Sequence, residues 1–299
     1  MEWVNKVLSV INNGLIKITN IFSYEQNNLN LIVEKNDISD ILDLLHRQEE
    51  RLLNQVKLEY QREAREIGSK NTYEFMYILA EVLRQNDLSL DIAKFSKPDF
   101  QEVFNLAIKG AYINGSKTDL NTLARLISRR ATSSDTDLQT MTIDDAISVV
   151  PKLNKKHISF LTFILLFKSM TLNNITKLND YEFSCKLFSE IIPDLREVTP
   201  WDIQYLESQR CLQINAFGDG DFIEHMKNVY PESPLSKFTN EELSQQILES
   251  KNLNQMVKIY NNDDLAISRL RATILGQMIA STNAKKYSPD SIDFDNFIK

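Results

Sequence analysis

The 299-residue sequence has little glycine and little proline, with seven of each. Average usage would give about 20 glycines and about 15 prolines in a chain of this length. These residues form the tight turns that join short strands, so their scarcity favours long helices over a sheet of many strands. The sequence also lacks the glycine-rich motifs of nucleotide-binding loops and the GxSxG motif of serine hydrolases.

Cysteine and long apolar runs are scarce as well. The two cysteines, Cys185 and Cys211, have no CxxC partner, so we predict neither a disulfide framework nor a zinc site, and a reducing cytoplasm is the natural compartment. The longest apolar run, 158–167, is about half as long as a bilayer requires and predicts a buried core helix. The first residues lack the basic leader and cleavage site of a secretory signal.

The formal net charge is −7, and a binder of nucleic acid normally presents a basic face. Nucleic acid is therefore not an expected partner. One basic cluster is present, formed by Arg125, Arg129, Arg130, Lys152, Lys155 and Lys156. Arg129 and Arg130 end a predicted helix, and we expect them to suit its negative end, with a local contact to nucleic acid or an acidic protein as the alternative. Trp201 and Tyr205 share a helix face and could stack on a base, but we expect them to pack in the core.

Helix starts are marked by four boxes in which Ser or Thr precedes an acid by three residues: Ser96 with Asp99, Thr142 with Asp145, Thr199 with Asp202, and Thr239 with Glu242. In such a box the hydroxyl accepts from a first-turn amide and the acid favours the positive helix end. Apolar residues recur every three to four positions after the boxes. We predict helices at about 3–22, 37–67, 71–86, 97–114, 119–131, 142–150, 155–169, 180–192, 200–210, 221–230, 240–250, 253–261 and 263–282.

No segment shows sustained alternation bounded by turn residues, so we predict no sheet. The expected fold is all-α, an irregular multi-helix bundle or a short helical solenoid with a long helix near the N-terminus. We divide the chain into an N-terminal part, 1–88, and a helical body, 89–299. The body comprises a core over 97–215, C-terminal helices over 221–282 and a tail over 283–299.

The first predicted helix carries an apolar stripe with few charges on its other faces. The side chains that we expect to make an interaction are Trp3, Val7, Leu8, Ile11, Leu15, Ile18 and Phe22. The stripe could dock on the chain's own domain, pair with a second subunit, or lie in a membrane interface through residues 1–22. A membrane-surface helix usually carries more lysine and arginine than this one does, so we favour burial within the protein or its homo-oligomer.

The stretch GDGDFIEH, residues 218–225, is the most site-like motif. It places the carboxylates of Asp219, Asp221 and Glu224 near two glycines, which suits a hard cation such as Ca²⁺ or Mg²⁺. It lacks the other ligands of an EF-hand loop, and the alternative is a turn followed by a helix capped by Asp221. His225 could act as a general base if a pocket brought a nucleophile close. We assign no catalytic residue and expect no cofactor.

The central part of the chain resembles a known family. The stretches are PDFQEVFNLAIKGAYINGSKTDLNTLARLISRRA, then TIDDAISVVPKLNKKHISFLTFILLF, and then WDIQYLESQRCLQIN. They are similar to the core of an uncharacterised bacterial all-helical family that is designated only by locus tags, and the resemblance covers about 97–215. It implies an all-α protein of bacteria or their phages and no particular reaction. Members often begin with a glycine- and asparagine-rich β-like segment, where this chain has its predicted amphipathic helix.

Helical surfaces without a chemical motif favour a non-enzymatic interaction protein, that is, a scaffold, adaptor or regulator in the bacterial cytoplasm. Its partner would be another protein or a second copy of the chain. Two alternatives stay open. One is a defence or stress effector, for instance in antiviral defence, that acts through the first helix at a membrane. The other is an enzyme with a site near Asp219–His225.

Overall fold

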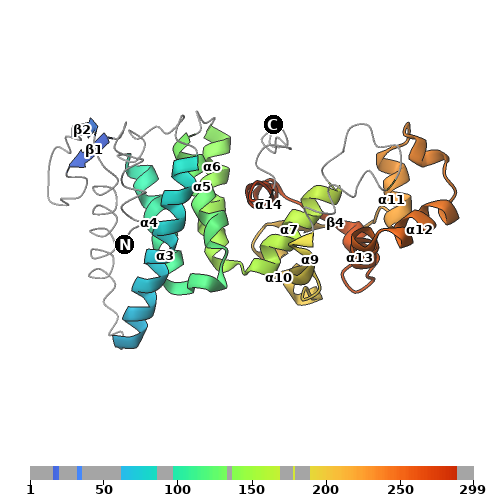
Figure 1. The fold of residues 1–299 in the computed structure, drawn as a ribbon, viewed down its shortest axis with the longest axis horizontal. Coiled ribbons are helices and arrows are strands. Elements are labelled where there is room, and N and C mark those ends of the chain that lie inside the picture. The colour runs from blue at the N-terminus through green and yellow to red at the C-terminus, as the bar shows by residue number, and fades with distance from the viewer. Residues whose placement is uncertain are drawn as a thin grey trace. The chain divides into compact units, whose positions relative to one another are not determined.

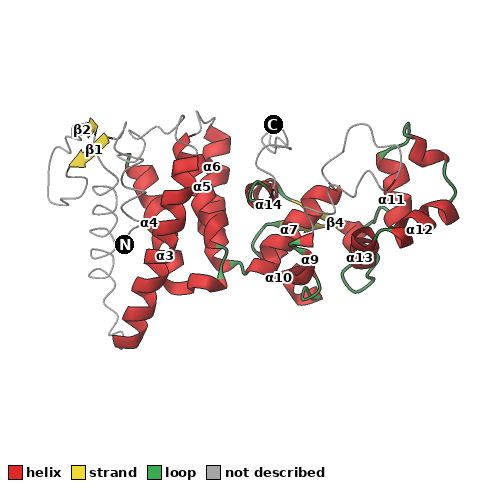
Figure 2. Cartoon of the chain, viewed as in Figure 1, coloured by secondary structure: helices red, strands yellow, loops and turns green. Residues whose placement is uncertain are grey.

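The computed structural model of the protein describes residues 16–19, 32–35, 62–85, 97–132, 137–168, 178 and 189–287. Helices dominate these residues, and the strands among them are short (Figure 2). The predicted all-α fold class is therefore confirmed. The chain divides into two compact units, Met1–Thr140 and Met141–Lys299, and the division falls within helix α6 (Asp137–Val149).

The first unit is built on α3 (Arg62–Gln85), against which both α4 (Pro98–Asn114) and α5 (Leu120–Thr132) pack (Figure 1). A 3-10 turn, Gly115–Lys117, leads from α4 towards α5. Apolar residues that recur every three to four positions on α4 face this interior and are all buried: Phe100, Val103, Phe104, Ala107, Ile108 and Ala111. Each of the larger side chains contributes about 1.5–3 kcal/mol when fully buried, which holds α4 in place.

Helix α3 runs without a break through Gly68, so the helix boundary predicted between residues 67 and 71 is wrong. A Cβ atom on Gly68 would lie 2.2 Å from the ring of Tyr112 on α4. The glycine therefore allows the two helices to pack closely and does not end the helix. The rest of the helix predicted over 37–67, and the domain boundary predicted at 88–89, lie outside the described residues.

The N-terminal part contains two strands, β1 (Ile16–Thr19) and β2 (Ile32–Lys35), which pair antiparallel with Ile16 opposite Lys35. The helix predicted over 3–22 is therefore wrong at residues 16–19. The sequence IKIT alternates apolar and polar residues and is rich in β-branched side chains, which favour a strand. Of the predicted interaction residues, Ile18 lies in β1. The others lie outside the described residues: Trp3, Val7, Leu8, Ile11, Leu15 and Phe22.

The second unit is arranged around α7 (Lys155–Lys168), in which every residue from His157 to Phe167 is buried. This confirms the core helix that the apolar run predicts. Helix α14 (Ile274–Ala284) packs along α7 (Figure 1). The other helices of the unit are α9 (Ile192–Leu195), α10 (Pro200–Ser208), α11 (Phe222–Val229), α12 (Asn240–Glu249) and α13 (Lys251–Tyr260), with 3-10 turns at Val150–Lys152, Pro234–Lys237 and Ile267–Arg269.

A second strand pair joins β3 (Leu212–Ile214) to β4 (Leu270–Ala272) in antiparallel register. The prediction of no sheet is therefore wrong here too, because strands so far apart in sequence share no hairpin turn that could reveal them. The single helix predicted over 263–282 is also wrong. Ala266 adopts a left-handed conformation with φ of 47°, β4 follows, and Thr273 caps α14 by accepting a hydrogen bond from the backbone N–H of Gly276.

Two of the predicted capping boxes are confirmed at the starts of α10 and α12. The Thr199 hydroxyl accepts from the N–H of Asp202, and the Asp202 carboxylate accepts from the N–H of Thr199. Thr239 and Glu242 exchange the same two hydrogen bonds. The sequence thus specifies where these two helices begin.

The other two boxes are wrong. Helix α6 begins at Asp137, so Thr142 lies inside the helix and not at its start. The N-cap of α4 is Lys97 rather than Ser96, and no side chain caps it. The proline at the first position of α4 needs no N–H partner, which reduces the need for a cap there.

Close packing at Gly276 leads to a stability prediction. A Cβ atom there would lie 2.0 Å from the backbone carbonyl oxygen of Cys211. We expect Gly276→Ala to lower the free energy of unfolding by about 1–3 kcal/mol, whereas Gly→Ala in an open helix stabilises by about 0.5–1 kcal/mol. Gly68→Ala should cost less, because the Tyr112 ring can turn away. Urea denaturation of both variants measures the difference, and a Gly276→Ala protein as stable as the parent would contradict this packing.

Candidate functional site

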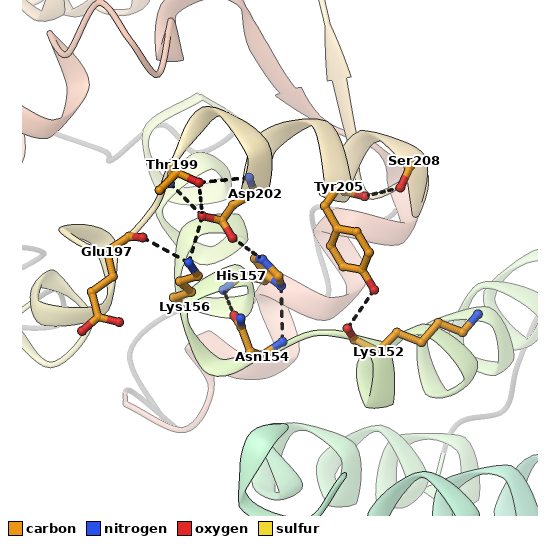
Figure 3. Close-up of polar contacts among 9 residues, drawn as sticks. All are labelled: Lys152, Asn154, Lys156, His157, Glu197, Thr199, Asp202, Tyr205 and Ser208. Atoms are coloured by element: carbon orange, nitrogen blue, oxygen red, sulfur yellow. Dashed lines mark hydrogen bonds and ion pairs between the residues drawn. The ribbon is translucent and has the colours of Figure 1, made fainter. Parts of the chain in front are cut away.

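Two clusters of polar side chains lie at opposite ends of α7. The first, which we term the Asp202 cluster, joins the first turn of α7 to the first turn of α10 (Figure 3). It consists of Asn154, Lys156, His157, Thr199 and Asp202. The capping box of α10 fixes the Asp202 carboxylate, and the α7 residues reach it from the side.

Every oxygen of the Asp202 carboxylate has a donor. Oδ1 accepts from His157 Nε2 at 2.8 Å, and Oδ2 accepts from Lys156 Nζ at 2.9 Å. Oδ2 also accepts from the N–H and the hydroxyl of Thr199, at 2.8 and 2.7 Å. Burial alone would raise the pKa of Asp202, but these hydrogen bonds hold it far below its ordinary value.

Both ring nitrogens of His157 are engaged. Nε2 donates to Asp202, while Nδ1 accepts from the backbone N–H of Asn154 at 3.3 Å. Burial lowers the pKa of His157, and the nearby Lys156 ammonium acts in the same direction, while the Asp202 carboxylate opposes both; the pKa stays below its ordinary value, which favours the neutral ring at pH 7. The Tyr205 ring packs on it at 5.3 Å between centroids, and the Tyr205 hydroxyl donates to the carbonyl of Lys152. This histidine therefore fixes two helix starts and leaves no ring nitrogen for a substrate.

The second cluster, which we term the Asp219 cluster, lies at the C-terminal end of α7. It gathers Lys168 from α7, Asp219 from the loop before α11, His225 from α11, Tyr260 from α13 and Arg271 from β4. The cluster thus brings together four separate stretches of the chain, at residues 168, 219–225, 260 and 271. Asp219 is also fixed through its backbone, since its N–H donates to the carbonyl of Ser268 at 3.2 Å.

The Lys168 side chain is completely buried, and its ammonium group donates to the Asp219 carboxylate, to the Ser268 carbonyl and to the Tyr260 hydroxyl. Arg271 Nη2 contacts both Asp219 oxygens, at 2.8 and 3.0 Å. Burial lowers the pKa of Lys168 and opposes the ion pair. Burial would likewise raise the pKa of Asp219, but Lys168 and Arg271 hold it below its ordinary value.

His225 completes the cluster from the inside. Its Nε2 donates to the carbonyl of Phe167 at 2.8 Å, so in the neutral ring the Nδ1 lone pair faces Asp219 Oδ2 at 3.5 Å. Burial lowers the pKa of His225 and keeps the ring neutral. The ring is only 3% exposed and stacks on Tyr260, which leaves a substrate no direct path to Nδ1.

The residues predicted from the GDGDFIEH stretch have separate roles. Asp219 and His225 do lie close together, but the Asp219 carboxylate is already paired with the side chains of Lys168 and Arg271. Asp221 caps α11 by accepting from the N–H of Glu224, as the alternative prediction had it. The Glu224 side chain lies over Gly220, whose φ is +82°. Within the described part of the chain, no three potential ligands of the His, Cys, Asp or Glu type gather as a metal site would require.

Sequence reasoning missed the partners Lys168, Tyr260 and Arg271. Each looks ordinary in its own segment: Lys168 is a basic residue in the last turn of a helix, and Arg271 falls inside a stretch predicted to be helical. Lys168 carries the better signal, because it is the first charge after eleven buried residues of α7 and must find a partner near the core.

The other sequence candidates are also placed. In the predicted basic cluster, Lys155 and Lys156 face Asp194 and Asp202, so these lysines are paired within the chain. Trp201 is 77% exposed, so the prediction that it packs in the core is wrong. Cys211 is buried, and burial raises the pKa of its thiol to about 12. Cys185 lies outside the described residues.

These features define a two-unit, all-α protein in which two clusters of charged side chains join the ends of α7 to later segments. A family model matches residues 49–258, more than half of the chain, and the chain belongs to that family, which is uncharacterised and designated by a locus tag. The resemblance predicted over about 97–215 falls inside this range. The match includes Lys168, Asp219 and His225 and ends before Tyr260. No curated protein and no solved structure matches the chain.

The Asp202 cluster predicts an unequal response to two similar substitutions. Asp202→Asn removes the charge that holds Lys156 and His157, and hydrogen bonds to a charged group are worth about 1.5–3 kcal/mol. We expect a loss of about 2 kcal/mol in the free energy of unfolding. Glu242→Gln in the matching box of α12 should cost below about 0.5 kcal/mol, because glutamine also completes a capping box. Equal losses in thermal denaturation would refute the special role of Asp202.

The Asp219 cluster predicts a stability loss that depends on pH. Asp219→Asn leaves the buried Lys168 ammonium without its counter-charge and should cost about 3 kcal/mol at pH 7. The pKa of Asp219 is lowered in the folded state, so its contribution is present above its unfolded pKa of about 3.9 and is lost as the pH falls below that value. The difference in the free energy of unfolding between parent and variant should therefore become smaller below about pH 4.

The control for this experiment is Asp221→Asn, two residues away. Asparagine caps a helix about as well as aspartate, so this variant should stay within about 0.5 kcal/mol of the parent at every pH. Chemical denaturation between pH 3 and pH 7 gives both curves. If the stability difference between the parent and Asp219→Asn were the same at every pH in this range, the charge of Asp219 would not stabilise the fold.

Proposed function

We propose that the protein is a non-enzymatic helical interaction protein, a scaffold, adaptor or regulator of the bacterial cytoplasm, and that the outer face of α3 binds its partner. The observation that carries this proposal is a set of large side chains on α3 that point away from α4 and α5. Ile67, Tyr73 and Tyr77 are 54%, 57% and 41% exposed.

These side chains lie on one side of a regular amphipathic helix. Phe75, Leu79 and Val82 are buried on the opposite side. Tyr73 and Tyr77 are four residues apart and are therefore neighbours along the helix surface. Tyrosine is enriched at protein interfaces because it gives a large, rigid contact area with a polar tip. A helix face of this kind is suited to packing against a partner's surface.

The chemistry of the two polar clusters supports an interaction role over an enzymatic one. In both clusters the carboxylate is saturated by cations and hydrogen bonds from its own chain, and both histidine rings are buried and neutral. An effector role through the first predicted helix has lost part of its basis, because residues 16–19 form a strand. None of the described helices combines the length and apolarity needed to cross a bilayer.

A photo-crosslinking amino acid in place of Tyr73 tests the proposal in cells that express the protein. We expect irradiation to give a discrete adduct of defined mass, because a partner seated on α3 would cover this position. Denaturing electrophoresis followed by mass spectrometry identifies the adduct. The same amino acid in place of Trp201, and of Glu241 on α12, gives the comparison at two other exposed positions.

The two comparison positions divide the outcomes. An adduct at residue 73 alone supports the α3 face as the binding surface. An adduct at residue 201 alone keeps an interaction function but moves the surface to α10. The absence of a discrete adduct at every position would refute the interaction proposal.

A further inference from the structure

We infer that the partner on the α3 face is α3 of a second copy of this chain, packed antiparallel about a twofold axis near residue 75. This inference rests on the proposed function and names its partner. It comes from the order of charges along the outer face, which runs through the exposed Glu66, Lys70 and Glu74, the half-buried Glu81 and the exposed Arg84.

In an antiparallel pair of identical helices, the numbers of two residues that face each other always add up to the same sum. With a sum of about 150, Glu66 faces the partner's Arg84 and Lys70 faces the partner's Glu81. Twofold symmetry repeats each pair, so four opposite-charge contacts form along the 24-residue helix. A parallel pair in register would set each charge against its own copy, and like charges in contact are unfavourable.

The centre of the same arrangement is aromatic. At a sum of 150, Tyr73 lies opposite the partner's Tyr77, and the symmetry mate repeats the contact. Both tyrosines are exposed in the chain, and aromatic rings at this spacing favour offset or edge-on packing. The face therefore has aromatic side chains near its middle and charges of both signs at its two ends, as interfaces do. Glu74, also near the middle, lies beside the partner's Glu74, and this one like-charge contact opposes the pairing.

The ion pair already present on α3 fits this scheme. Arg84 Nη2 bonds Glu81 Oε2 at 2.8 Å within the helix, and both groups are at the surface. An exposed pair of this kind contributes little by itself. In the antiparallel dimer the same two side chains meet the partner's Glu66 and Lys70, and four charges of alternating sign then form a network at each end of the interface.

Charge reversal tests the register directly. Lys70→Glu sets a carboxylate against the partner's Glu81 at both ends, and Glu81→Lys sets an ammonium against the partner's Lys70. We expect each single variant to raise the dimer dissociation constant about tenfold. The double variant Lys70→Glu/Glu81→Lys should recover most of the loss. Residues 70 and 81 are about 16 Å apart along their own helix, so a recovery can only come from contact between chains.

Sedimentation velocity over a range of protein concentrations measures the dissociation constants. Glu241→Lys on α12 changes the net charge as much as Glu81→Lys does and should leave the dimer unchanged. Circular dichroism melting of each variant establishes that the monomer still folds. Tyr73→Ser with Tyr77→Ser should also weaken the dimer, since it removes the aromatic middle.

The outcomes separate this inference from the proposed function. A dimer that tolerates both single reversals, or one that the double variant does not recover, overturns the antiparallel α3 pairing. A monomeric chain that still gives a crosslinked adduct with another protein at residue 73 overturns the second copy as partner and leaves the interaction function in place. A monomeric chain without any adduct removes both.

Discussion

The buried ammonium group of Lys168 is the constraint on which the second unit depends. Helix α7 is buried from His157 to Phe167, and its next residue carries a full charge into the same interior. An unpaired buried charge costs several kcal/mol, so the helix can end there only if a counter-charge reaches it. Asp219 supplies that charge, and Ser268 and Tyr260 accept the remaining ammonium hydrogen bonds. The loop, α13 and the turn before β4 are therefore positioned around one side chain.

The opposite end of α7 is fixed by the same kind of interaction. Asp202 receives Lys156 and His157 from the first turn of α7, while its own helix start holds it through Thr199. At each end of α7, a carboxylate from a later segment thus binds side chains of the helix and holds it in place. Between these two ends most of the packing is apolar, with two further hydrogen bonds: the Ser159 hydroxyl donates to Asp194 at 2.7 Å, and the Asn283 amide donates to the Thr162 hydroxyl at 2.9 Å. The polar contacts therefore determine where along α7 the later helices are placed.

The sequence predicts the helices well because their signals are local. The Thr199 and Thr239 boxes and the apolar stripe of α4 each lie within one turn or one helix. The strands β3 and β4 escape prediction because their pairing partner is far away in sequence. Only part of the Asp219 cluster can be predicted from the sequence, because some of its members are close in sequence and others are distant. Asp219 and His225 stand in one short motif, whereas Lys168 and Arg271 reach it only through the tertiary fold.

The contrast between the ion-paired side chains of the second unit and the exposed side chains of α3 bears on function. The carboxylates of Asp202 and Asp219 are ion-paired with cations of their own unit, so a ligand that bound these carboxylates would have to break those ion pairs. On α3 the surface groups are large and only partly engaged, with Tyr73 and Ile67 more than half exposed. Covering them removes apolar area from water at no such electrostatic cost. For a chain built in this way, association through a helix face is energetically more accessible than binding at the polar clusters.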